Sequence, residues 1–320
     1  KQGLYKPSME KDNCGVGAVA LLKGKSNHEA VMNALDILKN LSHRGSLGLD
    51  EASGDGSGIM TDLPYDFHKA MFEENGLELP EAGKYAVGML FLPRDPSSRL
   101  FCEGAFERVA REEGFEVLLW RDVPQKRAVC GKLAAATRPD IVQVFIKPAA
   151  DDVCENTLLI IRKRMQAFIS GSDVPYTEKF YICSLSVNTI VYKGLVPGRL
   201  LGEFYTDLED KGYKTRVAIV HERYSTNTFP SWELAQPFRL VAHNGEINTV
   251  SGNVNWMKAR EGVMTSKILG GRLKDVLPVI EPGGSDSACF DNALEFFIAN
   301  GHGPAKALSM MIPRAWDGNP

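Results

Sequence analysis

The stretch that decides the fold reads DNCGVGAVA, residues 12–20. A cysteine there heads an apolar run whose small and β-branched residues predict a strand. Thirteen residues precede Cys14, and cleavage of the Asn13–Cys14 bond would give that cysteine a free α-amino group beside its thiol. Because an α-amine titrates near about 7.7–8.0, one residue would then supply both nucleophile and base. Taken alone, a cysteine beside apolar residues is more commonly a buried packing residue.

The composition is that of a globular protein. The chain has 320 residues, 44% hydrophobic and 24% charged, which is enough material for a core. A net charge of −3 without a basic block argues against nucleic acid as a partner. No apolar run approaches the roughly 20 residues that span a bilayer, so no membrane partner is expected. Residues 1–13 are polar and lack the apolar core of a secretion signal, which leaves a short pro-segment as their interpretation.

The six cysteines are widely spaced and form no C-x-x-C pair. This spacing predicts neither a metal site nor a disulfide framework, and it favours a reducing compartment, the cytoplasm or an organelle stroma in a eukaryote. Four of the cysteines have apolar neighbours and are predicted to be packing residues: Cys102, Cys154, Cys183 and Cys289.

The first part of the chain predicts a helix and a tight turn. Asn27 can cap a helix whose apolar positions recur at helical spacing as far as Leu41, and the helix ends at SHRG, residues 42–45. GDGSG, residues 54–58, then leads into a short strand over 59–61. Its glycines could cradle a phosphate, but the pattern is not G-x-G-x-x-G and no long helix follows, so a strand-connecting turn is preferred.

Residues 84–192 differ from the preceding segment in that predicted strands and helices alternate regularly. They are predicted to form an inserted subdomain that acts as scaffold. Two strand–helix–strand units follow one another, and a hairpin return over 189–193 closes the second. The expected strands are 85–92, 115–120, 141–147 and 180–187, and the expected helices are 97–113 and 156–170.

Polar clusters then follow apolar segments, a common layout for a site on a rigid scaffold. A strand over 216–220 ends in HERYSTNT, residues 221–228, and a second strand over 240–242 ends in HNGEIN, residues 243–248. GGSDS, residues 283–287, is predicted to cap a helix that runs through Phe297.

Together these motifs resemble the glutaminase domain of glutamate synthase, a class II (N-terminal nucleophile) glutamine amidotransferase. The resemblance extends from Tyr5 to Pro313, and its most specific part is HERYSTNTFPSWELAQPFRLVAHNGEINT, residues 221–249. It implies an α+β protein with a four-layer αββα fold and two antiparallel sheets. It also implies an enzyme that converts L-glutamine and water to L-glutamate and ammonia through a thioester on Cys14.

The resemblance assigns the catalytic roles. Cys14 attacks the side-chain amide, while the Asn244 side chain and the Gly245 backbone N–H stabilise the oxyanion. By composition, Asn244-Gly245 is also a hairpin-turn dipeptide. His43, His221 and His243 lack the helical H-x-x-x-H spacing of a metal site and are interpreted as structural.

The substrate-binding roles come from the same resemblance. Arg223 would hold the α-carboxylate of glutamine, although it could instead form a surface ion pair. Asp286 would hold the α-ammonium, a role compatible with capping a helix. Arg44 would order the loop near Cys14, and Thr226 and Trp232 complete the substrate-binding set.

The sequence departs from the family in two ways. Mature members begin at the cysteine, so residues 1–13 are expected to be removed, by attack of Cys14 on the Asn13 carbonyl or otherwise. The domain, 14–320, is expected to be incomplete at its C-terminal end, and the FMN and iron–sulfur cluster of the synthase region are expected outside this chain, which would hold no cofactor or metal of its own. The expected partners are L-glutamine and the synthase region or subunit that receives ammonia and aminates 2-oxoglutarate. Two alternatives remain: another N-terminal-cysteine amide hydrolase, and a catalytically silent precursor that acts as a regulatory or interaction module.

Overall fold

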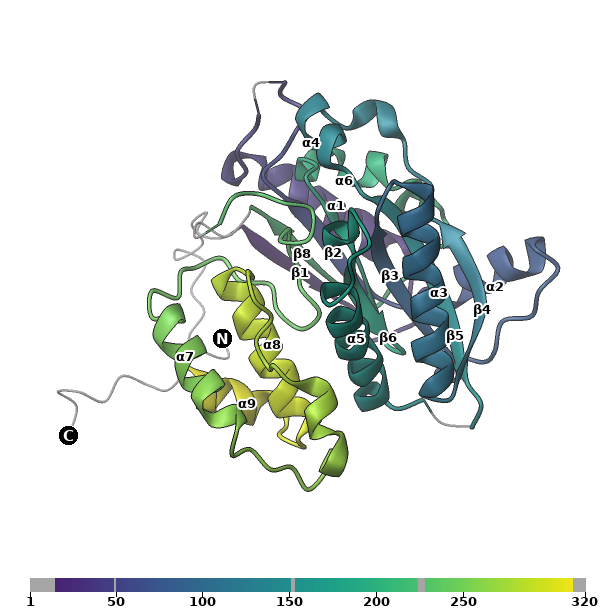
Figure 1. Ribbon diagram of the computed structural model, residues 1–320. Coiled ribbons are helices and arrows are strands. Elements are labelled where there is room, and N and C mark those ends of the chain that lie inside the picture. The colour runs from purple at the N-terminus through teal and green to yellow at the C-terminus, as the bar shows by residue number, and fades with distance from the viewer. Residues whose placement is uncertain (1–14, 49, 151–152, 224–227, 313–320) are drawn as a thin grey trace.

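The computed structural model describes residues 15–48, 50–150, 153–223 and 228–312, and these residues form two sheets of four strands each (Figure 1). In spatial order, the first sheet contains β1 (Val16–Ala20), β8 (Val217–Glu222), β2 (Ser57–Asp62) and β7 (Thr189–Gly194). The second contains β4 (Phe115–Asp122), β5 (Asp140–Pro148), β3 (Ala86–Leu92) and β6 (Tyr181–Ser186). Every pairing within both sheets is antiparallel.

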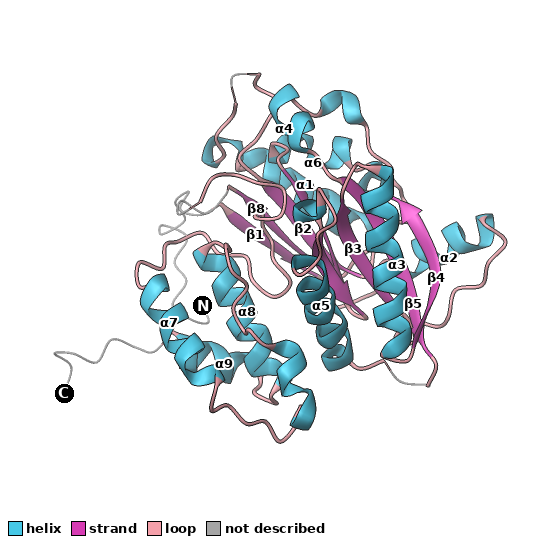
Figure 2. Cartoon of the chain, viewed as in Figure 1, coloured by secondary structure: helices cyan, strands magenta, loops and turns pink. Residues whose placement is uncertain are grey.

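Helices cover the two sheets on their outer sides, and Figure 2 shows the strands lying between them. Against the first sheet pack α1 (His28–Asn40) and α6 (Gly198–Phe204), and against the second pack α3 (Pro96–Glu112) and α5 (Glu155–Ser170). The layer order helix–sheet–sheet–helix confirms the four-layer αββα fold expected from the resemblance. The remaining α-helices of the described residues are α2 (Tyr65–Glu74), α4 (Lys132–Thr137), α7 (Val250–Glu261), α8 (Asp286–Ala299) and α9 (Pro304–Met311), and short 3-10 helices occur between them.

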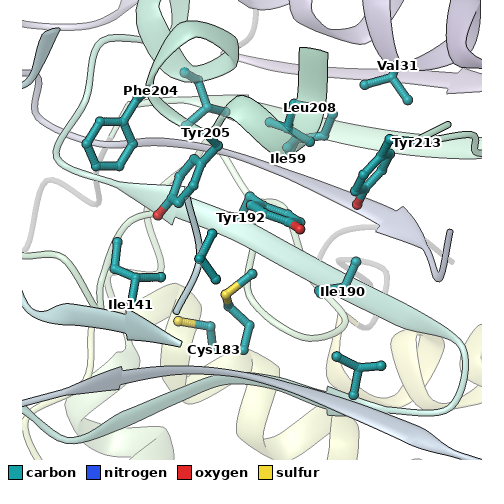
Figure 3. Close-up of a cluster of buried hydrophobic side chains, with 14 of the residues drawn as sticks. Val31, Ile59, Ile141, Cys183, Ile190, Tyr192, Phe204, Tyr205, Leu208 and Tyr213 are labelled. Carbon is teal, nitrogen blue, oxygen red and sulfur yellow. The ribbon is translucent and has the colours of Figure 1, made fainter. Parts of the chain in front are cut away.

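The alternation of apolar residues along each strand explains how the sheets stack. On β5, Ile141 and Phe145 enter the core shared by the two sheets, whereas Val142 and Val144 belong to the core under α3 and α5. The shared core extends to α1. Figure 3 shows tyrosines and aliphatic side chains gathered there: Val31, Ile59, Ile190, Tyr192, Tyr205 and Tyr213, all fully buried.

A buried polar network fixes the two sheets relative to each other. The Tyr192 hydroxyl, on β7, donates to Asp207 at 2.9 Å and accepts from the Gln143 side chain, on β5, at 2.8 Å. Both Asp207 oxygens also accept from Arg121 of β4, at 2.7 Å each. Each of these buried groups has a partner, so the network adds specificity to the stacking without leaving an orphaned polar atom.

Most local elements predicted from the sequence are confirmed. The Asn27 side chain caps α1 by accepting from the Ala30 N–H at 2.9 Å, and Ser285 caps α8. The strands and helices expected between residues 84 and 192 lie within a few residues of their predicted bounds. The interval supplies the whole second sheet and then β7, so it shares the central core with the first sheet.

The expected hairpin between 180–187 and 189–193 is wrong. β6 pairs with β3 in the second sheet, whereas β7 crosses to the first sheet and pairs with β2, Ile59 lying opposite Tyr192. Residues 190–193 are all buried. A strand buried on both faces needs a layer on each side, and the first sheet lies between its helices and the second sheet.

Among the described residues, no helix is long and apolar enough to cross a membrane.

Candidate active site

The site is located where β1 begins and β8 ends. Cys14 and Thr226 lie outside the described residues, so Gly15 marks the start of the nucleophile strand. The Glu222 N–H donates to the Gly15 carbonyl at 2.7 Å and continues the pairing of Val16 with His221. The residue that follows Cys14 in sequence is therefore bonded to the end of the strand that leads into Arg223.

Asn244 reaches the same place from a distant part of the sequence. A methyl group placed on Gly15 would lie 3.4 Å from the Asn244 Nδ2 atom. The amide predicted to stabilise the oxyanion is therefore beside the residue that follows the predicted nucleophile. Gly245, the second predicted donor, is exposed next to it.

The segment before Asn244 is a loop, so the strand predicted over 240–242 is wrong. Side chains bind the backbone groups that a neighbouring strand would have bound. The Gln236 side chain accepts from the His243 N–H at 2.8 Å and donates to the His243 carbonyl at 3.0 Å. The Leu240 N–H donates to Asp291 Oδ1, also at 2.8 Å. Asn244-Gly245 is consequently not a β-hairpin turn, because no strands flank it.

The N-terminus of α8 holds this loop on both sides of Asn244-Gly245. The His243 ring nitrogen Nδ1 lies 2.9 Å from the Ser287 hydroxyl, and the Ile247 N–H donates to Asp286 Oδ2 at 2.9 Å. A loop tied down at two points four residues apart has little freedom, which is what preorganised oxyanion donors require.

Asp286 combines two tasks in the structure. Its carboxylate is only 2% exposed, and Oδ1 accepts from the Ser287 N–H at 2.6 Å at the start of α8. Ser285 is the N-cap of α8, whereas Asp286 is the first residue of the helix, accepts from the adjacent N–H and anchors the loop through Ile247. The role of Asp286 as ligand to a substrate ammonium stays a prediction.

Arg223 has an unusual backbone conformation. Its φ of 124° lies in a region that non-glycine residues rarely adopt. The Arg223 N–H donates to the Gly56 carbonyl at 2.9 Å, which ties the strand end to the glycine-rich turn. Such outliers cost about 1–3 kcal/mol each and cluster at functional sites. Burial raises the pKa of the neighbouring Asp55 carboxyl, and the positive charge of Arg223 opposes that rise.

Arg44 lies on a turn that contacts the same strand end. It closes a short 3-10 helix, Ser42–Arg44, and Gly45 follows it. A methyl group on Gly45 would lie 2.4 Å from Glu222 Oε1. The SHRG turn is therefore adjacent to the last residue of β8, as expected if Arg44 orders the region around Cys14.

Trp232 is placed differently from the other predicted site residues. Its side chain is 3% exposed, and its Nε1–H donates to the Ala134 carbonyl at 3.2 Å. The ring packs edge-on against Phe91 with centroids 6.1 Å apart, within the core shared by the sheets. These contacts are those of a core residue, and a contact between Trp232 and substrate stays a prediction.

Comparisons with known proteins agree with this geometry. The family described as glutamine amidotransferases class-II matches residues 14–320, a match that starts at Cys14 itself. The chain belongs to the class II glutamine amidotransferases.

Three relatives show which branch of the family this amidotransferase resembles. It is 43% identical over 325 residues to "Glutamate synthase [NADH]" of Schizosaccharomyces pombe, covering 98% of this chain and 15% of that protein. It is 42% identical over 315 residues to "Ferredoxin-dependent glutamate synthase, chloroplastic" of Oryza sativa subsp. japonica, covering 97% and 19%. It is 42% identical over 325 residues to "Glutamate synthase [NADPH] large chain" of Bacillus subtilis, covering 99% and 21%. These matches confirm the resemblance to glutamate synthase, and the chain spans about a fifth or less of the length of each relative.

Two of the histidines interpreted as structural, His221 and His243, form hydrogen bonds within the protein. His221 is buried with Nε2 3.1 Å from the His243 carbonyl, and burial lowers its pKa to about 4. It is therefore neutral at physiological pH. Among the described residues, no group of three or more His, Cys, Asp or Glu side chains could hold a metal ion.

Cys102 and Cys183 are buried as predicted, but the packing role predicted for Cys154 is wrong, because Cys154 precedes α5 at the surface and is exposed.

Sequence reasoning missed the residues that position the amidotransferase loop. Gln236, Ser287 and Asp291 had been assigned no task, although the first two lie within the recognised motifs. A polar residue in the sequence does not reveal which distant backbone group or side chain it binds. Glu222 was missed because it stands between His221 and Arg223 in a polar motif, where a charged residue shows no sign of burial.

Proposed function

We propose that this domain hydrolyses L-glutamine to L-glutamate and ammonia, as the glutaminase part of a glutamate synthase. The observation that carries the proposal is the placement of Asn244 beside Gly15 by a loop anchored at His243 and Ile247. A nucleophile followed by a fixed amide donor is the arrangement that acyl transfer from an amide requires.

In the proposed mechanism, the Cys14 α-amine takes the thiol proton and the thiolate attacks the side-chain carbonyl carbon of glutamine. The Asn244 side-chain N–H and the Gly245 backbone N–H bind the resulting oxyanion. Collapse of the intermediate breaks the C–N bond, and the amine passes its proton to the leaving nitrogen, releasing ammonia. Water then hydrolyses the thioester to glutamate and frees the thiol. Each step uses only groups of the chain, the substrate and water.

Substrate recognition is proposed for the charged groups around this centre. Arg223 would bind the α-carboxylate and Asp286 the α-ammonium, with Arg44 ordering the nucleophile loop and Thr226 and Trp232 nearby. The strained backbone of Arg223 and the burial of Asp286 support these assignments. Glutamine carries both an α-carboxylate and an α-ammonium group, whereas a simple acylated amine lacks this pair of charges. Arg223 and Asp286 together would therefore favour glutamine over other amides.

Maturation is proposed to precede activity. Since the family match begins at Cys14, we assign residues 1–13 as a pro-segment whose removal creates the catalytic amine. The released ammonia would pass to a synthase region or subunit that aminates 2-oxoglutarate, in the cytoplasm or an organelle stroma. FMN and an iron–sulfur cluster would belong to that synthase part, so this domain would serve nitrogen assimilation without a cofactor of its own.

The test combines intact mass spectrometry with glutaminase assays. The purified protein should lack residues 1–13 and gain one adduct on Cys14 when treated with an electrophilic glutamine analogue. Asn244→Ala should lower kcat by about 10²–10³, the usual cost of removing one oxyanion donor. Asn255→Ala, on the exposed face of α7, is the matched control and should leave kcat unchanged. Retention of Lys1 in active protein, an adduct on another cysteine, or full activity of Asn244→Ala would each contradict the proposal.

A further inference from the structure

Glu222, the last residue of β8, occupies a closed slot beside the site. Its side chain is 2% exposed. The walls of the slot are two glycines from separate segments: a methyl group on Gly45 would lie 2.4 Å from Oε1, and one on Gly198 would lie 1.7 Å from Oε2. The carboxyl therefore fills space that any larger residue at either glycine would take.

Four segments of the site meet at this residue. Its N–H binds the Gly15 carbonyl at 2.7 Å, and the next N–H, of Arg223, binds the Gly56 carbonyl at 2.9 Å. The side chain meanwhile separates the SHRG turn from the start of α6. Movement of this one side chain would therefore disturb the strand after Cys14 and the turn that carries Arg44 together.

The surroundings of Glu222 favour its neutral form. Among the described residues, Oε2 has no hydrogen-bond partner. Asp55 faces it from the glycine-rich turn with both oxygens buried, so a second negative charge here would be repelled. Arg199 of α6 and the Gly198 N–H oppose these effects. Arg223 directly follows β8, and Arg44 precedes Gly45 on the SHRG turn. Burial, with the Asp55 charge, raises the pKa of Glu222 to about 8.

We propose that Glu222 is a positioning residue of the glutaminase site, which keeps the Gly15, Arg44 and Arg223 segments in register as a neutral carboxylic acid packed between Gly45 and Gly198. Ionisation would place an unpaired charge in the slot and loosen all three segments. The effect on turnover rests on the function proposed above, whereas the packing role does not.

Glu222→Gln tests the proposal, because Gln has the shape of the neutral acid and cannot ionise. The control is Glu178→Gln at an exposed position. Urea unfolding is measured from pH 5.5 to 9. Wild-type and Glu178→Gln proteins should lose stability as the pH rises toward 8, because the folded form holds a proton that the unfolded form releases near pH 4.5. Glu222→Gln should lack this slope.

The kcat/KM profile for glutamine supplies the second readout. From its maximum to pH 9, the wild-type value should fall by about tenfold as a group with a pKa of about 8 ionises. Glu222→Gln should stay within about threefold of wild type at pH 7 and lose the alkaline fall. Gly198→Ala, whose methyl group would displace Oε2, should reduce kcat/KM at every pH.

The two proposals fail in different ways. If no protein hydrolyses glutamine, the proposed function falls while the unfolding data still decide the role of Glu222. If Glu222→Gln parallels wild type in both pH dependences, or does not fold at pH 6, the positioning role is overturned and the glutaminase assignment stands.

Discussion

Replacement of Asp286 by Asn should release the loop that carries Asn244. In the structure the carboxylate accepts from the Ile247 N–H at 2.9 Å and from the Ser287 N–H at 2.6 Å. An asparagine has one oxygen, which would stay with the N–H of the adjacent Ser287 at the start of α8, so its NH₂ group would face the Ile247 N–H. Loss of a hydrogen bond to a charged group costs about 1.5–3 kcal/mol. Because about 1.4 kcal/mol is a factor of ten, the Ile247 amide should exchange with solvent about 10- to 100-fold faster.

Hydrogen–deuterium exchange of the peptide around Ile247 measures this directly. Asp66→Asn is the control, since Asp66 lies in the first turn of α2 and its side chain's only described bond is an exposed ion pair with Lys214 at 3.3 Å, so it shares the helix-terminal charge without binding a backbone N–H of the Asn244 loop. Glutaminase kcat should fall with the loosened loop, while β8 and β2 keep their protection. Unchanged exchange around Ile247 in a folded Asp286→Asn protein would refute the anchoring argument, even if KM rose through loss of an ammonium ligand.

Three further outcomes are expected. Gly15→Ala would bring a methyl group within 2.3 Å of the Glu222 carbonyl, and because backbone cannot move aside cheaply, urea unfolding should show a loss of about 1–3 kcal/mol together with loss of glutaminase activity. His221, whose pKa is lowered by burial from 6.5 to about 4, binds its proton only in the unfolded state between these values. Stability should therefore fall by up to about 3 kcal/mol on acidification through that window, a loss that His221→Gln should not show in a urea titration series. Leu38→Ala in the core should cost about 2–5 kcal/mol by thermal or urea unfolding, against almost nothing for Leu22→Ala, which is 94% exposed.

Local sequence patterns were sufficient to predict the helices and the strand that carry the site. Asn27 predicted the start of α1, the apolar run before His221 predicted β8, and Gly-Gly-Ser predicted the start of α8. These predictions succeeded because a cap or an apolar period depends on residues a few positions apart. The long motif between residues 221 and 249 also determined the family, and with it the four-layer fold.

The tertiary structure alone decided which distant groups meet. β7 follows β6 at once in the sequence yet joins the other sheet, and the apolar run at 240–242 is a loop because Gln236 and Asp291 bind its backbone. Glu222 reads as an ordinary charged residue at the end of a strand, but the slot between Gly45 and Gly198 is built from two segments that both precede it by more than 20 residues in the sequence. Hydrogen bonding and burial depend on neighbours in space, and a single sequence specifies neighbours along the chain, so pairing, loop anchoring and the protonation of a buried acid had to come from the fold.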